Sequence, residues 1–437
     1  MKDRPLLPLP PGNLGLPIIG QTLTLMRRPK FRQENRQKYG DIFKTRYLGM
    51  NFIYLYGKEA NKFILSNENK YFVNSSFPNS KKIFGTNNLT WQRGEIHKQS
   101  RKILSRSFNE KAIQKYITIS SEITKFYLEK WSNCDAIALY PELKNYSFDL
   151  ICKIILGVES ASKTELFELL NNLSSGIFSI PLPVPQTRFG RALQSRKKLF
   201  HKLDEIIIQH REQPQNDALD ILLQTEYLSD LELKEQIINL ILLGHKEIAS
   251  ALSSFFVSIA QHRDIRDRLN REQKCFADSQ TLNLEQIKSM TYLENTIKEV
   301  LRIFPPVPGG IRKVIQDCSF QGYQIPKNWY VIYDLKSTHQ DPEIYTQPEL
   351  FNPDTFNSLN KEDKKQPYSY LPFGGGLREC LGKELALTIM KIFNSILLRN
   401  YDWKLLSELD LETSSQFIPT WQDVKIILIK SPQVSGI

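Results

Sequence analysis

Residues 229–262 limit the fold more than any other part of the sequence. They read SDLELKEQIINLILLGHKEIASALSSFFVSIAQH, with apolar residues on nearly every side of a helix. Ser229 followed by Glu232 is the pattern of a capping box, which marks where such a helix begins. A helix that is apolar nearly all round must be covered by other elements. The sequence therefore predicts a long helix at the centre of a large domain.

Most of the remaining chain is also predicted to be helical. From about residue 91 to residue 300 the pattern is amphipathic, interrupted by the proline-rich SIPLPVPQTRFG at 179–190. Thr291 and Glu294 suggest a second capping box, and the helix that follows must end at Pro305. A last long helix is expected from Leu381 to about residue 398, with apolar residues on one face.

Strands are predicted only in short pieces. Residues 41–57 alternate around a Gly-Met-Asn turn as a β-hairpin does, within an N-terminal β-hairpin region at 41–65. GIRKV, CSFQGYQI and WYVIYDLK follow the proline pair at 305–306. No repeat or linker is recognisable, so we expect one mainly α domain with small β-sheets over 1–437, preceded by a proline-rich lead at 1–20.

Composition narrows the class of protein. With 437 residues the chain can bury a large core, and its net charge of +11 comes from basic residues interspersed among 47 acidic ones. That mixture does not favour a nucleic-acid partner. Apolar runs are too short for a transmembrane anchor, and the five cysteines are scattered, which argues against disulfides or a zinc site. We expect a cytoplasmic protein.

The run FGGGLRECLG at 373–382 carries the strongest chemical signal. Three glycines, Gly374 among them, let the backbone approach a bulky group, and Cys380 stands directly before the predicted last helix. Backbone N–H groups and the helix dipole favour a negative charge at that place, so the sulfur is expected to be a thiolate. A stabilised thiolate, on a bare loop that can lie beneath a flat macrocycle, is what thiolate ligation of a haem iron needs.

This run resembles the haem-binding loop of the cytochrome P450 superfamily, F-x-x-G-x-R-x-C-x-G. The fixed positions are filled by Phe373, Gly376, Arg378, Cys380 and Gly382. The resemblance implies haem b (heme b), with Cys380 as the iron ligand, and the cytochrome P450 fold, in which a long central helix crosses above the haem and the cysteine loop lies beneath it.

The resemblance extends to residues elsewhere in the chain. Glu299 and Arg302 match the family's E-x-x-R pair, although FNPDTF has Thr355 where an arginine is usual, which predicts an altered network around that pair. By the same resemblance, Arg378, His97, Arg101 and Arg312 are expected to contact the haem propionates.

Within the superfamily, SIPLPVPQTRFGRALQSRKKL and FPPVPGGIRKV are similar to segments of animal retinoic acid hydroxylases and their soluble bacterial relatives. The implied activity is hydroxylation of a hydrophobic small molecule with O2, and the candidates are a retinoid, a sterol or another isoprenoid. Electrons are expected from a separate acidic, ferredoxin-like protein that docks on basic residues, chiefly Lys98, Lys102 and Lys383.

The centre of the 229–262 helix departs from the family. Aligned on Gly244, the chain has Lys246 and Glu247 where an acid and a threonine normally deliver protons to bound oxygen. Gly244 inside a helix is unfavourable, which suggests close approach of the cofactor. Three interpretations stay open: Glu247 serves an ordinary monooxygenase, it splits peroxide in a peroxygenase or isomerase, or it pairs with Lys246 or His245 in a haem protein with little turnover.

Overall fold

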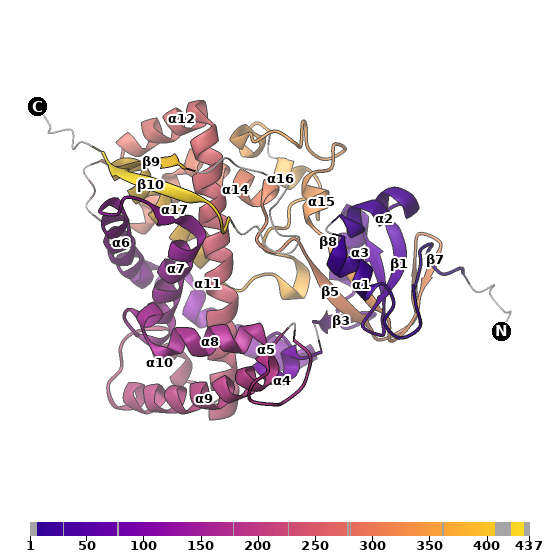
Figure 1. The fold of residues 1–437 in the computed structure, drawn as a ribbon. Coiled ribbons are helices and arrows are strands. Elements are labelled where there is room, and N and C mark those ends of the chain that lie inside the picture. Colours follow the sequence, from indigo (N-terminus) through magenta and orange to yellow (C-terminus); the bar gives the residue numbers. More distant parts are fainter. Residues whose placement is uncertain are drawn as a thin grey trace, which may run out of the picture. The chain divides into compact units, whose positions relative to one another are not determined.

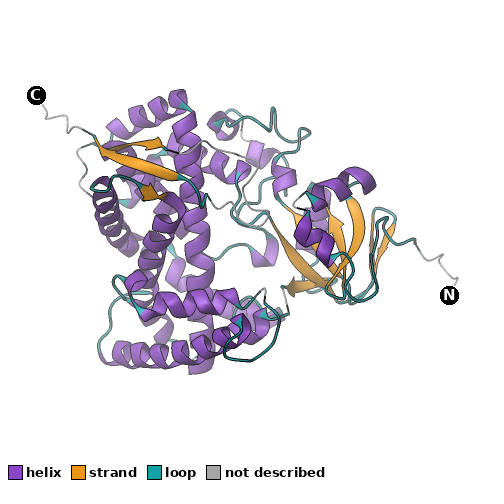
Figure 2. Cartoon of the chain, viewed as in Figure 1, coloured by secondary structure: helices purple, strands orange, loops and turns teal. Residues whose placement is uncertain are grey.

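The computed structural model describes residues 7–28, 30–76, 78–177, 179–225, 227–277, 279, 281–360, 362–406 and 421–431. The chain forms two compact units, one from segments 1–76, 307–350 and 358–380 and the other from 77–306, 351–357 and 381–437. Figure 1 labels the elements and Figure 2 distinguishes helices from strands. The first unit contains most of the strands and the second most of the helices.

A mixed five-stranded sheet organises the first unit. Its order is β1-β2-β8-β5-β3, and only the β2–β8 pair is parallel among these neighbours. The strands are β1 (Ile42–Tyr47), β2 (Met50–Leu55), β3 (Phe72–Ser75), β5 (Gly309–Val314) and β8 (Tyr330–Asp334), with β6 (Cys318–Phe320) and β7 (Tyr323–Ile325) as a separate hairpin. The predicted strands are thus confirmed.

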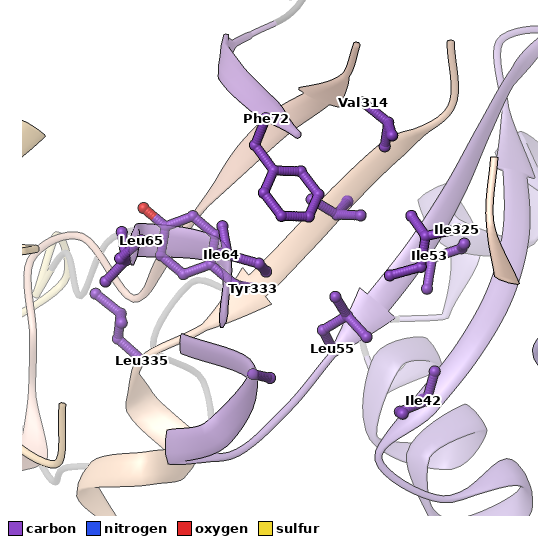
Figure 3. Close-up of a cluster of buried hydrophobic side chains, with 12 residues drawn as sticks. Ile42, Ile53, Leu55, Ile64, Leu65, Phe72, Val314, Ile325, Tyr333 and Leu335 are labelled. Atoms are coloured by element: carbon purple, nitrogen blue, oxygen red, sulfur yellow. The ribbon is translucent and has the colours of Figure 1, made fainter. Parts of the chain in front are cut away.

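The short helices of this unit are spread over its three segments. They are α1 (Thr22–Arg27), α2 (Phe31–Tyr39), α3 (Lys58–Ser66), α15 (Lys336–His339), α16 (Glu362–Lys365) and the 3-10 turn η4 (Gly376–Arg378). Figure 3 shows the core that joins α3 to the sheet, where Ile64 and Leu65 pack with Phe72, Val314 and Tyr333.

The second unit is a helical assembly with one small sheet. Its long helices are α5 (Gly94–Leu104), α6 (Glu110–Ser132), α7 (Leu139–Leu156), α8 (Glu165–Ser175), α9 (Arg188–Glu212), α11 (Asp230–Gln261), α12 (Arg263–Lys274), α14 (Thr291–Ile303) and α17 (Lys383–Asn400). Shorter elements are α4 (Ser80–Phe84), η1 (Ser105–Phe108), η2 (Ala161–Lys163), α10 (Ala218–Leu223), α13 (Leu284–Ser289), η3 (Pro353–Phe356) and the strands β4 (Ile137–Ala138), β9 (Tyr401–Leu405) and β10 (Lys425–Lys430). A mainly helical fold with small sheets is confirmed.

Helix α11 is the predicted central helix. The Ser229 side chain accepts from the Glu232 N–H, and Glu232 accepts from the Ser229 N–H in return, so the capping box is present. Among the helices described, α11 alone is long and apolar enough to cross a membrane, which we did not expect from the sequence. However, 72% of its apolar window is buried inside the protein, as in the core helices of soluble proteins.

Four predicted local features are wrong. Residues 58–65 form helix α3 rather than part of the hairpin region, whose turn is Leu48-Gly49 instead of Gly-Met-Asn. Helix α17 starts at Lys383, not at Leu381. Helix α14 has no capping box at Thr291, because the carboxylate of Glu272 accepts from two N–H groups of its first turn instead.

The pair Glu299 and Arg302 is completely buried in α14. Arg302 donates from Nε and Nη2 to the two carboxylate oxygens of Glu299 at 2.7 and 2.8 Å. The backbone N–H of Asn352 donates to Glu299 at 2.7 Å, so the FNPDTF segment joins this pair through its main chain. Its Asp354 is held by both terminal nitrogens of Arg268. The expected alteration of the family network around Thr355 stays a prediction.

Candidate functional site

The cysteine loop is closed by its own backbone. The N–H of Cys380 donates to the carbonyl of Phe373 at 2.8 Å, and Gly374 donates to the carbonyl of Leu371. Gly374 and Gly376 have φ angles of +70° and +65°, which favour glycine. A Cβ on Gly376 would also lie 2.8 Å from the carbonyl oxygen of Leu65, so this glycine lets the loop touch α3.

The thiol of Cys380 is exposed, as an external ligand requires. Because α17 starts at Lys383, Leu381 and Gly382 separate the cysteine from the helix, and Gly382 is its N-cap. The helix dipole acts within about one turn of the terminus, so its support for a thiolate is weaker than the sequence suggested. A side chain at position 382 would have room, because a Cβ added to Gly382 would have no described atom within 4 Å. Packing among the described residues therefore does not require glycine at this position.

Arg312 and Arg378 meet at a residue that sequence reasoning missed. The buried carboxylate of Glu68 accepts from Nε of Arg312 at 3.1 Å and from Nε of Arg378 at 3.2 Å. The three come from β5, from η4 and from the chain after α3. No local pattern marks Glu68, because its partners lie 244 and 310 residues away in sequence.

Helix α5 carries the other two predicted propionate contacts. His97 is buried, and Arg101 follows it one turn later with no hydrogen bond or ion pair to any residue that the structure describes. The indole N–H of Trp91 is also buried and lacks an acceptor within the described chain. These donors fit the carboxylates of a cofactor.

The centre of α11 has an uncovered stripe. Leu240, Gly244 and Glu247 are only partly buried and Leu243 is 54% exposed, although most of the helix is buried. The spacing i, i+3, i+4 and i+7 places these four residues on one face. The stripe is apolar except for one carboxylate, which suits an apolar ligand.

Glu247 is an acid with few partners. Its Oε2 atom is buried without a hydrogen bond, and burial raises the pKa of the carboxyl to about 7. Lys246 donates to the hydroxyl of Ser174 on α8 at 3.1 Å, and burial lowers its pKa. Among the described residues, no hydrogen bond or ion pair joins Glu247 to Lys246 or His245, although the nearby charge of Lys246 opposes the rise in the pKa of Glu247. Pairing of Glu247 therefore stays one of the three interpretations.

His245 is a core residue. It is buried, its Nδ1 lies 2.7 Å from the carbonyl of Ile241, and its ring meets Phe148 edge-on at 5.3 Å. Burial lowers the pKa of His245 to about 3, so the ring is neutral at physiological pH.

Gly244 is partly buried and lies beside α7. A Cβ there would lie 3.6 Å from the side chain of Ile151, an ordinary contact. We therefore expect Gly244→Ala to raise the free energy of unfolding of the haem-free protein by about 1 kcal/mol, since alanine is the better helix former. Chemical denaturation measures this change. A lower free energy would show that α7 cannot accept the added methyl group.

The predicted residues thus form two groups. The cysteine loop, Arg312 and Arg378 belong to the first unit, where Glu68 joins the two arginines. His97, Arg101 and the α11 residues belong to the second unit.

Comparison with known proteins identifies relatives over nearly the whole chain. The family model described as Cytochrome P450 matches residues 10–428. A Synechocystis sp. protein described as cytochrome P450 120 is 41% identical over 414 residues, which are 93% of each chain. Cytochrome P450 26A1 of Gallus gallus is 35% identical over 92% of this chain and 86% of its own. The solved structure of retinoic acid-bound cyanobacterial CYP120A1 has a TM-score of 0.90 and 38% identity, covering 97% of this chain and 100% of the other.

Proposed function

Because this chain belongs to the cytochrome P450 family and is a haem-dependent monooxygenase, we propose that it hydroxylates a long apolar isoprenoid acid of the retinoid type. The observation that carries this proposal is the likeness to CYP120A1, which was solved with retinoic acid bound. The apolar stripe of α11, with Leu243 exposed in its middle, supports a hydrophobic substrate.

The same proposal assigns the cofactor contacts. Cys380 is the iron ligand, because its thiol is exposed at the end of a glycine-rich loop that its own backbone closes. Arg312, Arg378, His97 and Arg101 hold the propionates through charge-assisted hydrogen bonds. The haem supplies the activation of molecular oxygen. We assign to Glu247 the role of holding or moving a proton, and the pKa of about 7 that burial gives its carboxyl supports this role.

A titration with all-trans retinoic acid tests the substrate. We expect a saturable change in the haem absorption spectrum and a hydroxylated product when electrons are supplied. Retinol, which lacks the carboxylate, and a sterol are the comparison ligands. If a sterol gives the tighter binding and the faster product formation, the retinoid assignment is wrong, whereas the haem assignment stands.

We also propose that the enzyme acts in the cytoplasm, where its five free cysteines would stay reduced. The electron donor that we propose is an acidic, ferredoxin-like protein. Lys98 and Lys102 are exposed on α5, and Lys383 is half-buried at the start of α17. Lys98 has a weak ion pair with Glu95 at 3.8 Å, which leaves it able to bind a partner.

Charge reversal tests this docking surface. Lys98→Glu combined with Lys102→Glu should slow reduction by an acidic ferredoxin on the order of 5-fold at low ionic strength, with a smaller effect at high salt. Stopped-flow reduction at several salt concentrations measures this. Lys111→Glu, an exposed charge on α6, is the matched control. Equal rates for the two variants would exclude docking at Lys98 and Lys102.

A second candidate function is peroxide-driven oxidation without a redox partner. The observation that favours it is the unpaired carboxyl oxygen of Glu247 at the position where the family usually has threonine. A carboxyl group that exchanges its proton near neutral pH is suited to acid–base chemistry on peroxide.

A further inference from the structure

Glu68 is a buried carboxylate whose backbone is fixed on both sides. It follows α3 and precedes β3, and its side chain is 3% exposed. Leu65 and Phe72, which flank it in sequence, both lie in the hydrophobic cluster of Figure 3. The N–H of Asn74 donates to Glu68 Oε1 at 3.2 Å. The carboxylate therefore has a defined place beside the sheet.

The two arginines use only part of their hydrogen-bonding capacity on Glu68. Each donates from Nε to a different oxygen of the same carboxylate. Arg312 also donates from Nη1 to the Asn74 side chain at 2.9 Å and to its neighbouring carbonyl at 3.1 Å, while Nη2 has no hydrogen bond within the described chain. Its side chain is only 6% exposed, so a buried cationic donor is left available.

The charges of Glu68, Arg312 and Arg378 distinguish this cluster from an ordinary structural ion pair. Arg312 and Arg378 share the single carboxylate of Glu68, and a buried cation such as Arg312 is unfavourable unless an anion lies near it. Without Glu68 the two arginines would repel each other, and Arg312 would keep only its hydrogen bonds to the Asn74 side chain and the Ile311 carbonyl. The cluster is thus suited to receive a carboxylate ligand.

We propose that Glu68 is a positioning residue for the cofactor: it orients Arg312 and Arg378 toward the haem propionates and limits the positive charge around them. This inference rests on the proposed assignment of the two arginines to the propionates. Asn74 shares the task, because it fixes Nη1 of Arg312 without adding charge.

The test compares variants of the haem-loaded protein. Glu68→Gln keeps the shape but removes the charge and one acceptor, since its amide N–H2 cannot accept from the second arginine. We expect haem transfer to excess apomyoglobin to become at least about 5-fold faster. The haem reduction potential should rise, because losing a nearby negative charge favours the reduced iron.

Two further variants separate the causes. Glu59→Gln removes the same charge from an exposed position on α3 and should change neither measurement. Asn74→Ala should speed haem release while leaving the potential near that of the wild type. It also tests positioning if Glu68→Gln does not fold.

Three outcomes would overturn the inference. Haem release that is unchanged or slower in Glu68→Gln would show that the carboxylate does not position the arginines. A potential equal to that of Glu59→Gln would show that its charge does not reach the cofactor. Unchanged release from Asn74→Ala would exclude positioning through Arg312. Failure of the retinoid assignment would leave all of these results unaffected, because none of them uses substrate.

Discussion

Cys380→Ala should lose thiolate ligation completely. The reduced carbon monoxide complex of the wild type is expected to show the strongly red-shifted Soret band of a thiolate-bound haem, and the variant should lack it. The physical reason is specific to this loop: two glycines with positive φ and the Phe373–Cys380 hydrogen bond present an exposed thiol.

A second cysteine variant controls for general damage. Cys134 is also exposed, but it lies just after α6 without a glycine-rich loop, so Cys134→Ala should keep the red-shifted band. If the band persists in Cys380→Ala, another group binds the iron and the assignment of the site is wrong. A band lost in both variants would point to misfolding instead.

The helices could be predicted where the sequence signal is local. The capping box at Ser229 and the nearly continuous apolar pattern after it are both properties of neighbouring residues, and α11 begins and ends as predicted. The failure at Thr291 has the opposite cause. Glu272, about 20 residues earlier, supplies the acceptor for the first turn of α14, and no pattern around Thr291 could show this.

The site shows the same division between local and distant signals. The cysteine loop is a contiguous run, so its residues were found together. Glu68 was missed because it becomes important only when folding brings β5 and η4 to the end of α3. Exposure of Leu243 could not be predicted either, since one apolar residue in an apolar helix looks like any other.

Glu247 should make stability depend on pH. Burial raises the pKa of its carboxyl from 4.5 to about 7, so between these values the folded state binds more protons than the unfolded state. Stability contributed by this group is therefore present below about pH 4.5 and is lost as the pH rises to about 7, a total of about 3 kcal/mol. Glu247→Gln cannot ionise. The variant should gain about 2.5 kcal/mol relative to the wild type between pH 5 and pH 8, measured by denaturation at each pH.

The same carboxyl should determine which oxidant the enzyme uses. Glu247→Thr restores the usual family residue and removes the acid that could act on peroxide, so the ratio of oxygen-driven to peroxide-driven turnover should rise by about 10-fold or more. Both activities are measured on one apolar substrate. Glu247→Gln is the control that keeps the shape and hydrogen-bonding capacity but cannot exchange a carboxyl proton. If both variants keep the wild-type ratio, Glu247 has only a structural role, because a proton-transfer group cannot be replaced by a neutral side chain without changing the reaction it serves.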